Sequence, residues 1–182
     1  MRFSAYLCVF LLAVSQGCFF YASQGNTEAA PFDSTSASAI LPVGETAIKA
    51  ARGEQTAAVS ICAVRVDRSD VAFPSSGPLS EDLLGIKEIT IVKEVKISLD
   101  GHKLFVPYSV YADLINPSKA TVGFKDGMFV LTIQGGDAAW SYFLDVYFDA
   151  KQVHRRSYYW ALVPDKPAQE TRYWLRKLKD VE

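Results

Sequence analysis

The chain has 182 residues, of which 49% are hydrophobic and 21% are charged, so it can bury the core of an ordinary globular domain. Its net charge of −1 at pH 7 lacks the positive excess typical of nucleic-acid-binding proteins, and we expect no nucleic acid among its partners. With only three cysteines, Cys8, Cys18 and Cys62, the chain is not a disulfide-rich scaffold.

Residues 1–17 have the pattern of an export signal. Arg2 supplies a short positive region, and an uninterrupted apolar run follows over residues 5–14. Such a run has the length of a signal-peptide core and is too short to span a bilayer. We therefore predict an exported protein.

Two processing routes remain open for this signal. The residues Ser15-Gln16-Gly17-Cys18 resemble a bacterial lipobox, although Ser15 and Gln16 depart from its usual Leu and Ala or Ser. Cleavage before Cys18 would give a lipoprotein that is anchored through acyl chains on this residue. Ordinary cleavage up to residue 25 would release a periplasmic or secreted protein, so a lipid anchor is the only membrane contact that we expect.

Residues 18–39 are predicted to form a flexible tether, and residues 40–182 a single β-rich domain. Residues 26–39 are rich in Ser, Thr and Ala and show no hydrophobic period. A segment of this composition buries too little apolar surface to offset its chain entropy.

The first half of the domain alternates apolar and polar residues at strand spacing. Residues 57–66 and 89–99 are predicted strands, and Asp100-Gly101 favours a tight turn into a returning strand over residues 102–106. Residues 45–52 fit either a helix or the first arm of a hairpin. We predict one capped helical turn over residues 80–85 and a two-turn helix over residues 107–115.

The second half is predicted to be a series of hairpins around one central strand. That strand covers residues 140–149, with Trp140, Tyr142, Leu144, Val146 and Phe148 on an apolar face. Further strands are predicted over residues 120–124, 128–134, 152–162 and 170–179, although the last also fits a helix. The expected fold is mainly β: an antiparallel β-sandwich or open barrel of about seven or eight strands with one or two short helices.

No catalytic motif, metal site or cofactor site is evident in the sequence. His102 and His154 have no second ligand at metal-binding spacing. Asp145 and Asp149 are four residues apart on a strand, about 13 Å, which is too far for a catalytic pair. Asp113 could approach one of them from the predicted helix.

One group of residues suggests a binding surface. Arg156, Tyr158 and Trp160 share one face of their strand, and matching parity would place them beside Phe143 and Tyr147 of the central strand. Arg, Tyr and Trp are enriched at protein interfaces. The alternative is that these side chains pack in the core.

The sequence therefore favours an exported, non-catalytic binding or inhibitor-type domain. Its expected partner is a protein or a glycan of the envelope. The alternatives are a hydrolase acting on envelope carbohydrate and a structural or assembly accessory without a defined ligand.

Overall fold

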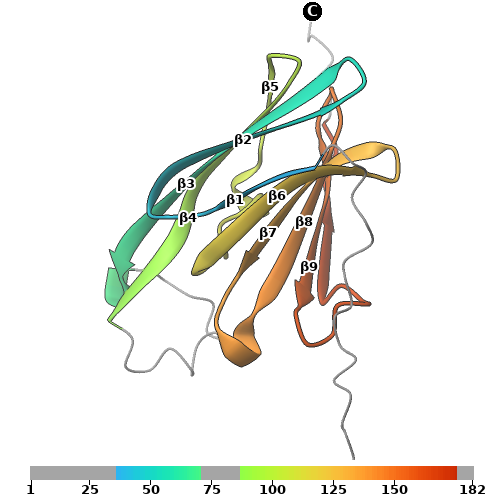
Figure 1. The fold of residues 1–182 in the computed structure, drawn as a ribbon. Coiled ribbons are helices and arrows are strands. Elements are labelled where there is room, and N and C mark those ends of the chain that lie inside the picture. Colours follow the sequence, from blue (N-terminus) through green and yellow to red (C-terminus); the bar gives the residue numbers. More distant parts are fainter. Residues whose placement is uncertain (1–35, 71–86, 176–182) are drawn as a thin grey trace, which may run out of the picture.

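The computed structural model describes residues 36–70 and 87–175. The predicted signal, Cys18, the helical turn at 80–85 and the end of the last predicted strand lie outside them. The described residues form ten strands and three 3-10 helices (Figure 1): β1 (Ala37–Ile40), β2 (Gly44–Arg52), β3 (Gln55–Asp67), η1 (Arg68–Asp70), β4 (Glu88–Leu99), β5 (His102–Leu104), η2 (Tyr108–Val110), β6 (Pro117–Lys125), β7 (Met128–Gly135), η3 (Ala138–Trp140), β8 (Tyr142–Phe148), β9 (Val153–Trp160) and β10 (Gln169–Arg172).

Two antiparallel sheets pack face to face, which confirms the predicted β-sandwich. Sheet A has the order β1-β6-β7-β8-β9-β10, and sheet B has the order β2-β3-β4-β5. The core lies between them and contains Leu131, Leu144 and Val146 from sheet A, and Ile61 and Ile97 from sheet B. Burial of these apolar side chains is the main force that holds the two layers together.

Tight turns set the register of two hairpins. Asp100-Gly101 joins β4 to β5 with φ values of 51° and 81°, and Asp126-Gly127 joins β6 to β7 with φ values of 53° and 81°. Positive φ at both central residues is the geometry of a type I′ turn, which Asp-Gly adopts readily. Both predicted hairpins are confirmed.

The strand count exceeds the predicted seven or eight because the chain forms two strands near its start. The segment 45–52 is a strand within β2, not a helix. The strand β1 covers Ala37–Ile40 and so includes the last three residues of the segment 18–39. β1 has no clear strand pattern in the sequence, because its side chains are mostly short and the segment is rich in Ser and Ala. In the structure, Ala37 and Ala39 pack against the core and the strand pairs with β6.

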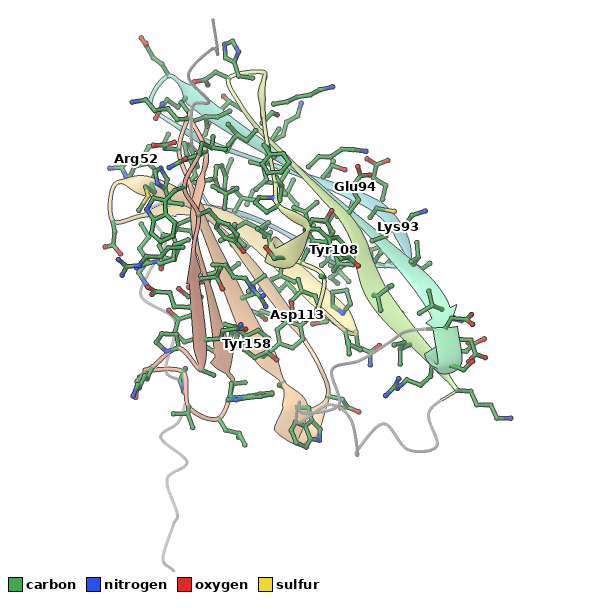
Figure 2. The ribbon with its side chains drawn as sticks, turned by 180° about the vertical axis from the view of Figure 1, so that it is seen from behind. Arg52, Lys93, Glu94, Tyr108, Asp113 and Tyr158 are labelled. Atoms are coloured by element: carbon green, nitrogen blue, oxygen red, sulfur yellow. The ribbon has the colours of Figure 1, made fainter. Side chains whose placement is uncertain are left out.

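Lys93 interrupts the apolar face predicted for residues 89–99 because the strand contains a β-bulge. Cys62 of β3 pairs with Glu94 and Ala63 pairs with Val92, which leaves Lys93 as the extra residue. Figure 2 shows Lys93 and Glu94 on β4. The bulge shifts the alternation by one residue, so Val92, and not Ile91, joins Val95 in the core.

The predicted two-turn helix over residues 107–115 is wrong. This part of the chain lies in the crossover segment, residues 105–116, which leads from β5 of sheet B to β6 of sheet A. Only Tyr108–Val110 form a 3-10 helix. Residues 111–113 form turns, and the chain meets β4 only at residues 114–115, where Val92 donates its backbone N–H to the Leu114 carbonyl and Ile115 bridges to Ile91.

The central strand is confirmed with a later start. β8 lies between β7 and β9, and its apolar face of Tyr142, Leu144, Val146 and Phe148 is buried. Trp140 belongs to η3 instead. Within residues 36–70 and 87–175, no helix has the length and apolar character needed to cross a bilayer.

Candidate functional site

Two residues of the predicted binding surface face the core. Tyr158 pairs with Leu144 and Arg156 pairs with Val146, so both lie on the buried face of sheet A. They are only 9% and 4% exposed. Trp160 is half-buried and packs against the same core.

Phe143 and Tyr147 lie on the opposite face of sheet A. The structure therefore does not bring the five predicted residues together. Next to the β8–β9 turn Phe148 pairs with Val153, and a β-bulge then leaves His154 as an extra residue of β9. Beyond the bulge Tyr147 is opposite Arg155 and Phe143 is opposite Tyr159. The face of β9 that the sequence predicts beside Phe143 and Tyr147 is therefore one residue out of phase, because the bulge adds one residue to β9.

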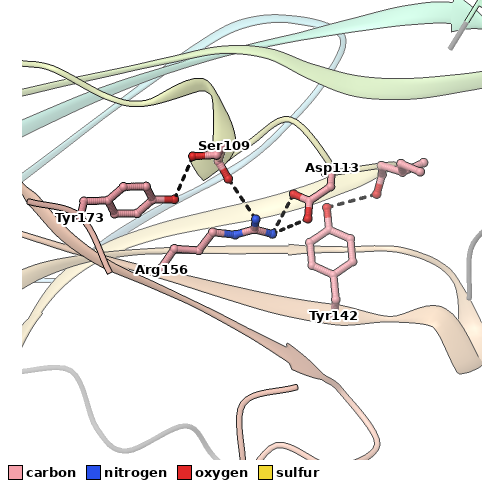
Figure 3. Close-up of polar contacts among 6 residues, drawn as sticks. Ser109, Asp113, Tyr142, Arg156 and Tyr173 are labelled. Carbon is pink, nitrogen blue, oxygen red and sulfur yellow. Dashed lines mark hydrogen bonds and ion pairs between the residues drawn. The ribbon is translucent and has the colours of Figure 1, made fainter. Parts of the chain in front are cut away.

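Arg156 binds the crossover segment from inside the sandwich. Its Nη2 donates to Asp113 Oδ1 at 2.7 Å and Oδ2 at 2.6 Å, and its Nη1 donates to the Ser109 carbonyl at 2.9 Å (Figure 3). Figure 2 labels Asp113 and Tyr108 on this segment and Tyr158 on β9. Arg156 therefore links the crossover segment to sheet A, which is a structural role.

An aromatic row continues from Arg156 towards the end of β9. Tyr158 stacks on Tyr142 with ring centroids 5.3 Å apart, Trp160 meets Tyr158 edge-on at 5.3 Å, and Trp140 meets Trp160 at 5.8 Å. The Tyr142 hydroxyl donates to the Ile115 carbonyl at 3.1 Å (Figure 3). Burial raises the pKa of Tyr158 to about 12, as expected for a hydroxyl that is removed from water inside the sandwich.

The face of sheet A that points away from sheet B carries cation, carboxylate and aromatic side chains together. We call the following residues of β8 and β9 the outer cluster: Phe143, Asp145, Tyr147, Arg155, Ser157 and Tyr159. The Arg155 guanidinium lies 4.0 Å from the Tyr147 ring centroid, a cation–π contact. Thr132 Oγ1 donates to Asp145 Oδ1 at 2.6 Å.

This outer face is less hydrated than the exposed side of a sheet usually is. Tyr147 is 2% exposed and Ser157 is 1% exposed, while Val130 beside Tyr147 is fully buried. Desolvation raises the pKa of Asp145, and the opposing influences of the Thr132 hydroxyl, Lys125 and Arg155 do not cancel it. Asp145 is thus a carboxyl group held where its charged form is disfavoured.

Asp145→Asn is expected to raise the stability of the protein at pH 7. The native state binds the Asp145 proton more tightly than the unfolded chain, so the wild type loses stability as pH rises above about 4 and through the raised pKa. The Asn variant has no such loss. Thermal melts between pH 4 and pH 7 should show its advantage growing with pH, and an Asn variant that is less stable at pH 7 would contradict the desolvation argument.

The structure separates the other candidate groups. Asp113 binds Arg156 on the buried side of sheet A, whereas Asp145 lies on the outer side, so they do not form a carboxylate pair. His154 Nε2 lies 2.8 Å from Asp149 Oδ2 at the β8–β9 turn. In the described part of the chain, no group of three or more His, Cys, Asp or Glu residues could hold a metal ion.

Comparison with known proteins gives no relative from which a role could be taken. The chain matches no protein-family model, no curated protein sequence and no solved structure. The outer cluster is therefore interpreted from its own chemistry.

Proposed function

We propose that this chain is an exported envelope protein that binds a protein partner, without catalysis, through the outer cluster of sheet A. The observation that carries the proposal is the juxtaposition of Arg155, Tyr147 and Asp145 on a half-buried outer face. Arg and Tyr are over-represented among the residues that dominate binding energy in interfaces.

The cation–π pair favours a protein over a glycan. Sugars stack on open aromatic faces, but the Arg155 guanidinium covers the Tyr147 ring and Tyr147 is nearly fully buried. The guanidinium is also held near Glu170, with Nη1 3.8 Å from Oε2. A fixed, partly desolvated cation of this kind suits a carboxylate or a backbone carbonyl of a protein.

The desolvated carboxyl group of Asp145 supports the proposal that this residue serves recognition and not stability. Thr or Asn at its position would bond to Thr132 without a buried charge. A chain that keeps a carboxyl group at a cost in stability commonly does so for function.

Arg155→Ala is expected to weaken partner binding by at least about 30-fold, the effect of losing a residue that dominates an interface. The partner is first captured from envelope extract on the immobilised wild-type protein and purified, and its affinity is then measured by calorimetry. Arg65→Ala is the matched control because Arg65 is an exposed strand arginine of sheet B, with 63% of its side chain accessible and Glu88 nearby.

Equal affinities for the wild type, Arg155→Ala and Tyr159→Ala would overturn the proposed surface. A captured ligand that proves to be a glycan would overturn the choice of a protein partner. Circular dichroism of each variant must first show a wild-type fold, so that loss of binding is not a consequence of unfolding.

Export belongs to the same proposal. The apolar run at residues 5–14 supports a signal peptide, and Cys18 is the proposed site of lipidation if cleavage occurs before it. The intact mass of protein recovered from the envelope distinguishes acylated Cys18 from a soluble protein that starts near residue 25.

A further inference from the structure

The edge strand of sheet B is long and regular. β2 pairs with β3 over nine residues without a register shift, and no other strand among the described residues pairs with it. It contains no proline. Proteins usually protect such an edge with short strands, bulges, prolines or charges, because its free N–H and C=O groups can accept another strand.

The charges on this edge are arranged symmetrically about Ala47. Glu45 and Lys49 both lie on the exposed side of β2, each two residues from Ala47. Within one chain they are about 13 Å apart along the strand and cannot form an ion pair. Lys49 forms no ion pair with any residue in the described ranges.

We propose that two copies of this chain associate through β2, antiparallel and around a two-fold axis at Ala47. In this register Glu45 of each copy lies directly opposite Lys49 of the other, and two equivalent ion pairs form. Side chains directly opposite in antiparallel strands have Cβ atoms about 4.5–5.5 Å apart, which is within reach of these two residues.

In the same register, exposed residues of one copy lie opposite exposed residues of the other, and core-facing residues lie opposite core-facing residues. Ala47 lies opposite itself on the exposed side, and Thr46 lies opposite Ile48 on the side that faces the core. Ser60 Oγ donates to Glu45 Oε1 at 2.6 Å and holds this carboxylate on the exposed side. The isologous contact closes after two copies, so it produces a dimer and not a fibre. It uses the opposite sheet from the outer cluster and is independent of the proposed partner.

Charge reversal tests the register directly. Glu45→Lys places Lys opposite Lys, and Lys49→Glu places Glu opposite Glu, so each single variant is expected to raise the dimer dissociation constant at least about tenfold. The double variant Glu45→Lys/Lys49→Glu restores both pairs and should dimerise like the wild type. An equimolar mixture of the two single variants should form a heterodimer. Sedimentation velocity over a concentration series measures all four cases.

Three outcomes would overturn the proposal. They are a wild type that stays monomeric up to about 1 mM, single variants that dimerise unchanged, and a double variant that is no better than the singles. Melting temperatures of all variants confirm that the comparison is between folded proteins.

A disulfide test locates the two-fold axis. With Cys8, Cys18 and Cys62 changed to Ser, Ala47→Cys should form an intermolecular disulfide under mild oxidation, because residues on the axis have Cα atoms about 5 Å apart. Ala51→Cys is the matched control, since Ala51 is exposed on the same strand, lies outside the proposed ion pairs, and its two copies are about 26 Å apart along the strands in this register. Equal cross-linking at both positions would contradict the axis at Ala47.

Discussion

Leu144→Ala is expected to lower the free energy of unfolding by about 3 kcal/mol, because it empties a fully buried site in the centre of the sandwich. Leu144 lies on the fourth strand of sheet A and is flanked by Ile133 on β7 and Tyr158 on β9. Strands on both sides and a sheet across the core restrict collapse around the cavity. Urea unfolding measures the loss, and Val146→Ala should show a somewhat smaller one.

Lys96→Ala is the control for this prediction. Lys96 lies on β4 with 62% of its side chain accessible, and it pairs with Glu94, with Nζ 2.8 Å from Oε2. Removal of an exposed ion pair on a strand should change stability by less than about 0.5 kcal/mol. A larger loss for Lys96→Ala than for Leu144→Ala would mean that the strand faces are assigned incorrectly.

Asp113→Ala is expected to destabilise the protein by about 3 kcal/mol, although Asp113 itself is well exposed. The side chain of Arg156 is only 5% accessible, and Asp113 is its one carboxylate partner among the described residues. Without Asp113, a buried guanidinium keeps a single bond to the Ser109 carbonyl. Removing one member of a buried pair leaves an uncompensated charge, and the accessibility of this site to water places the loss at the lower end of the usual range.

Arg156→Met should be the milder change of the two. It removes the buried charge and leaves Asp113, 43% accessible, free to be hydrated. Chemical denaturation of both variants gives the order, and Asp113→Asn separates the loss of charge from the loss of an acceptor. If Arg156→Met were clearly the more damaging change, packing of its long side chain would outweigh the ion pair.

The sheet architecture was predictable from the sequence because it rests on local patterns. Alternating residues in β8 and the Asp-Gly turns at 100–101 and 126–127 specify strands and hairpins from a few neighbouring residues. The errors occur where contacts with residues far away in the sequence determine the local structure. Ala37 and Ala39 form a strand because β6 is available to pair with, and the extended chain at Ile115 depends on β4.

The position of the proposed binding surface depends on which alternate residues of β9 share a face with Phe143 and Tyr147, and the sequence leaves this open. The residue types were anticipated, since Phe143, Tyr147 and Asp145 do share a face with an arginine and a tyrosine. The partners are Arg155 and Tyr159, and not the adjacent Arg156 and Tyr158. β9 carries Arg-Arg and Tyr-Tyr pairs, so each of its faces has one arginine and one tyrosine. The length of the turn at 149–152 and the β-bulge at His154 together select between them.

The order of strands in sheet A has a consequence for how the chain folds. From β6 to β10, each strand pairs with the next one in the sequence, so this part can form by successive local hairpin closures. β1 is different: its partner is β6, and all of sheet B lies between them in the sequence. Local pairings form quickly and distant ones slowly. A chain synthesised from its N-terminus therefore holds β1 unpaired until β6 has emerged, and the free edge of β6 is closed last.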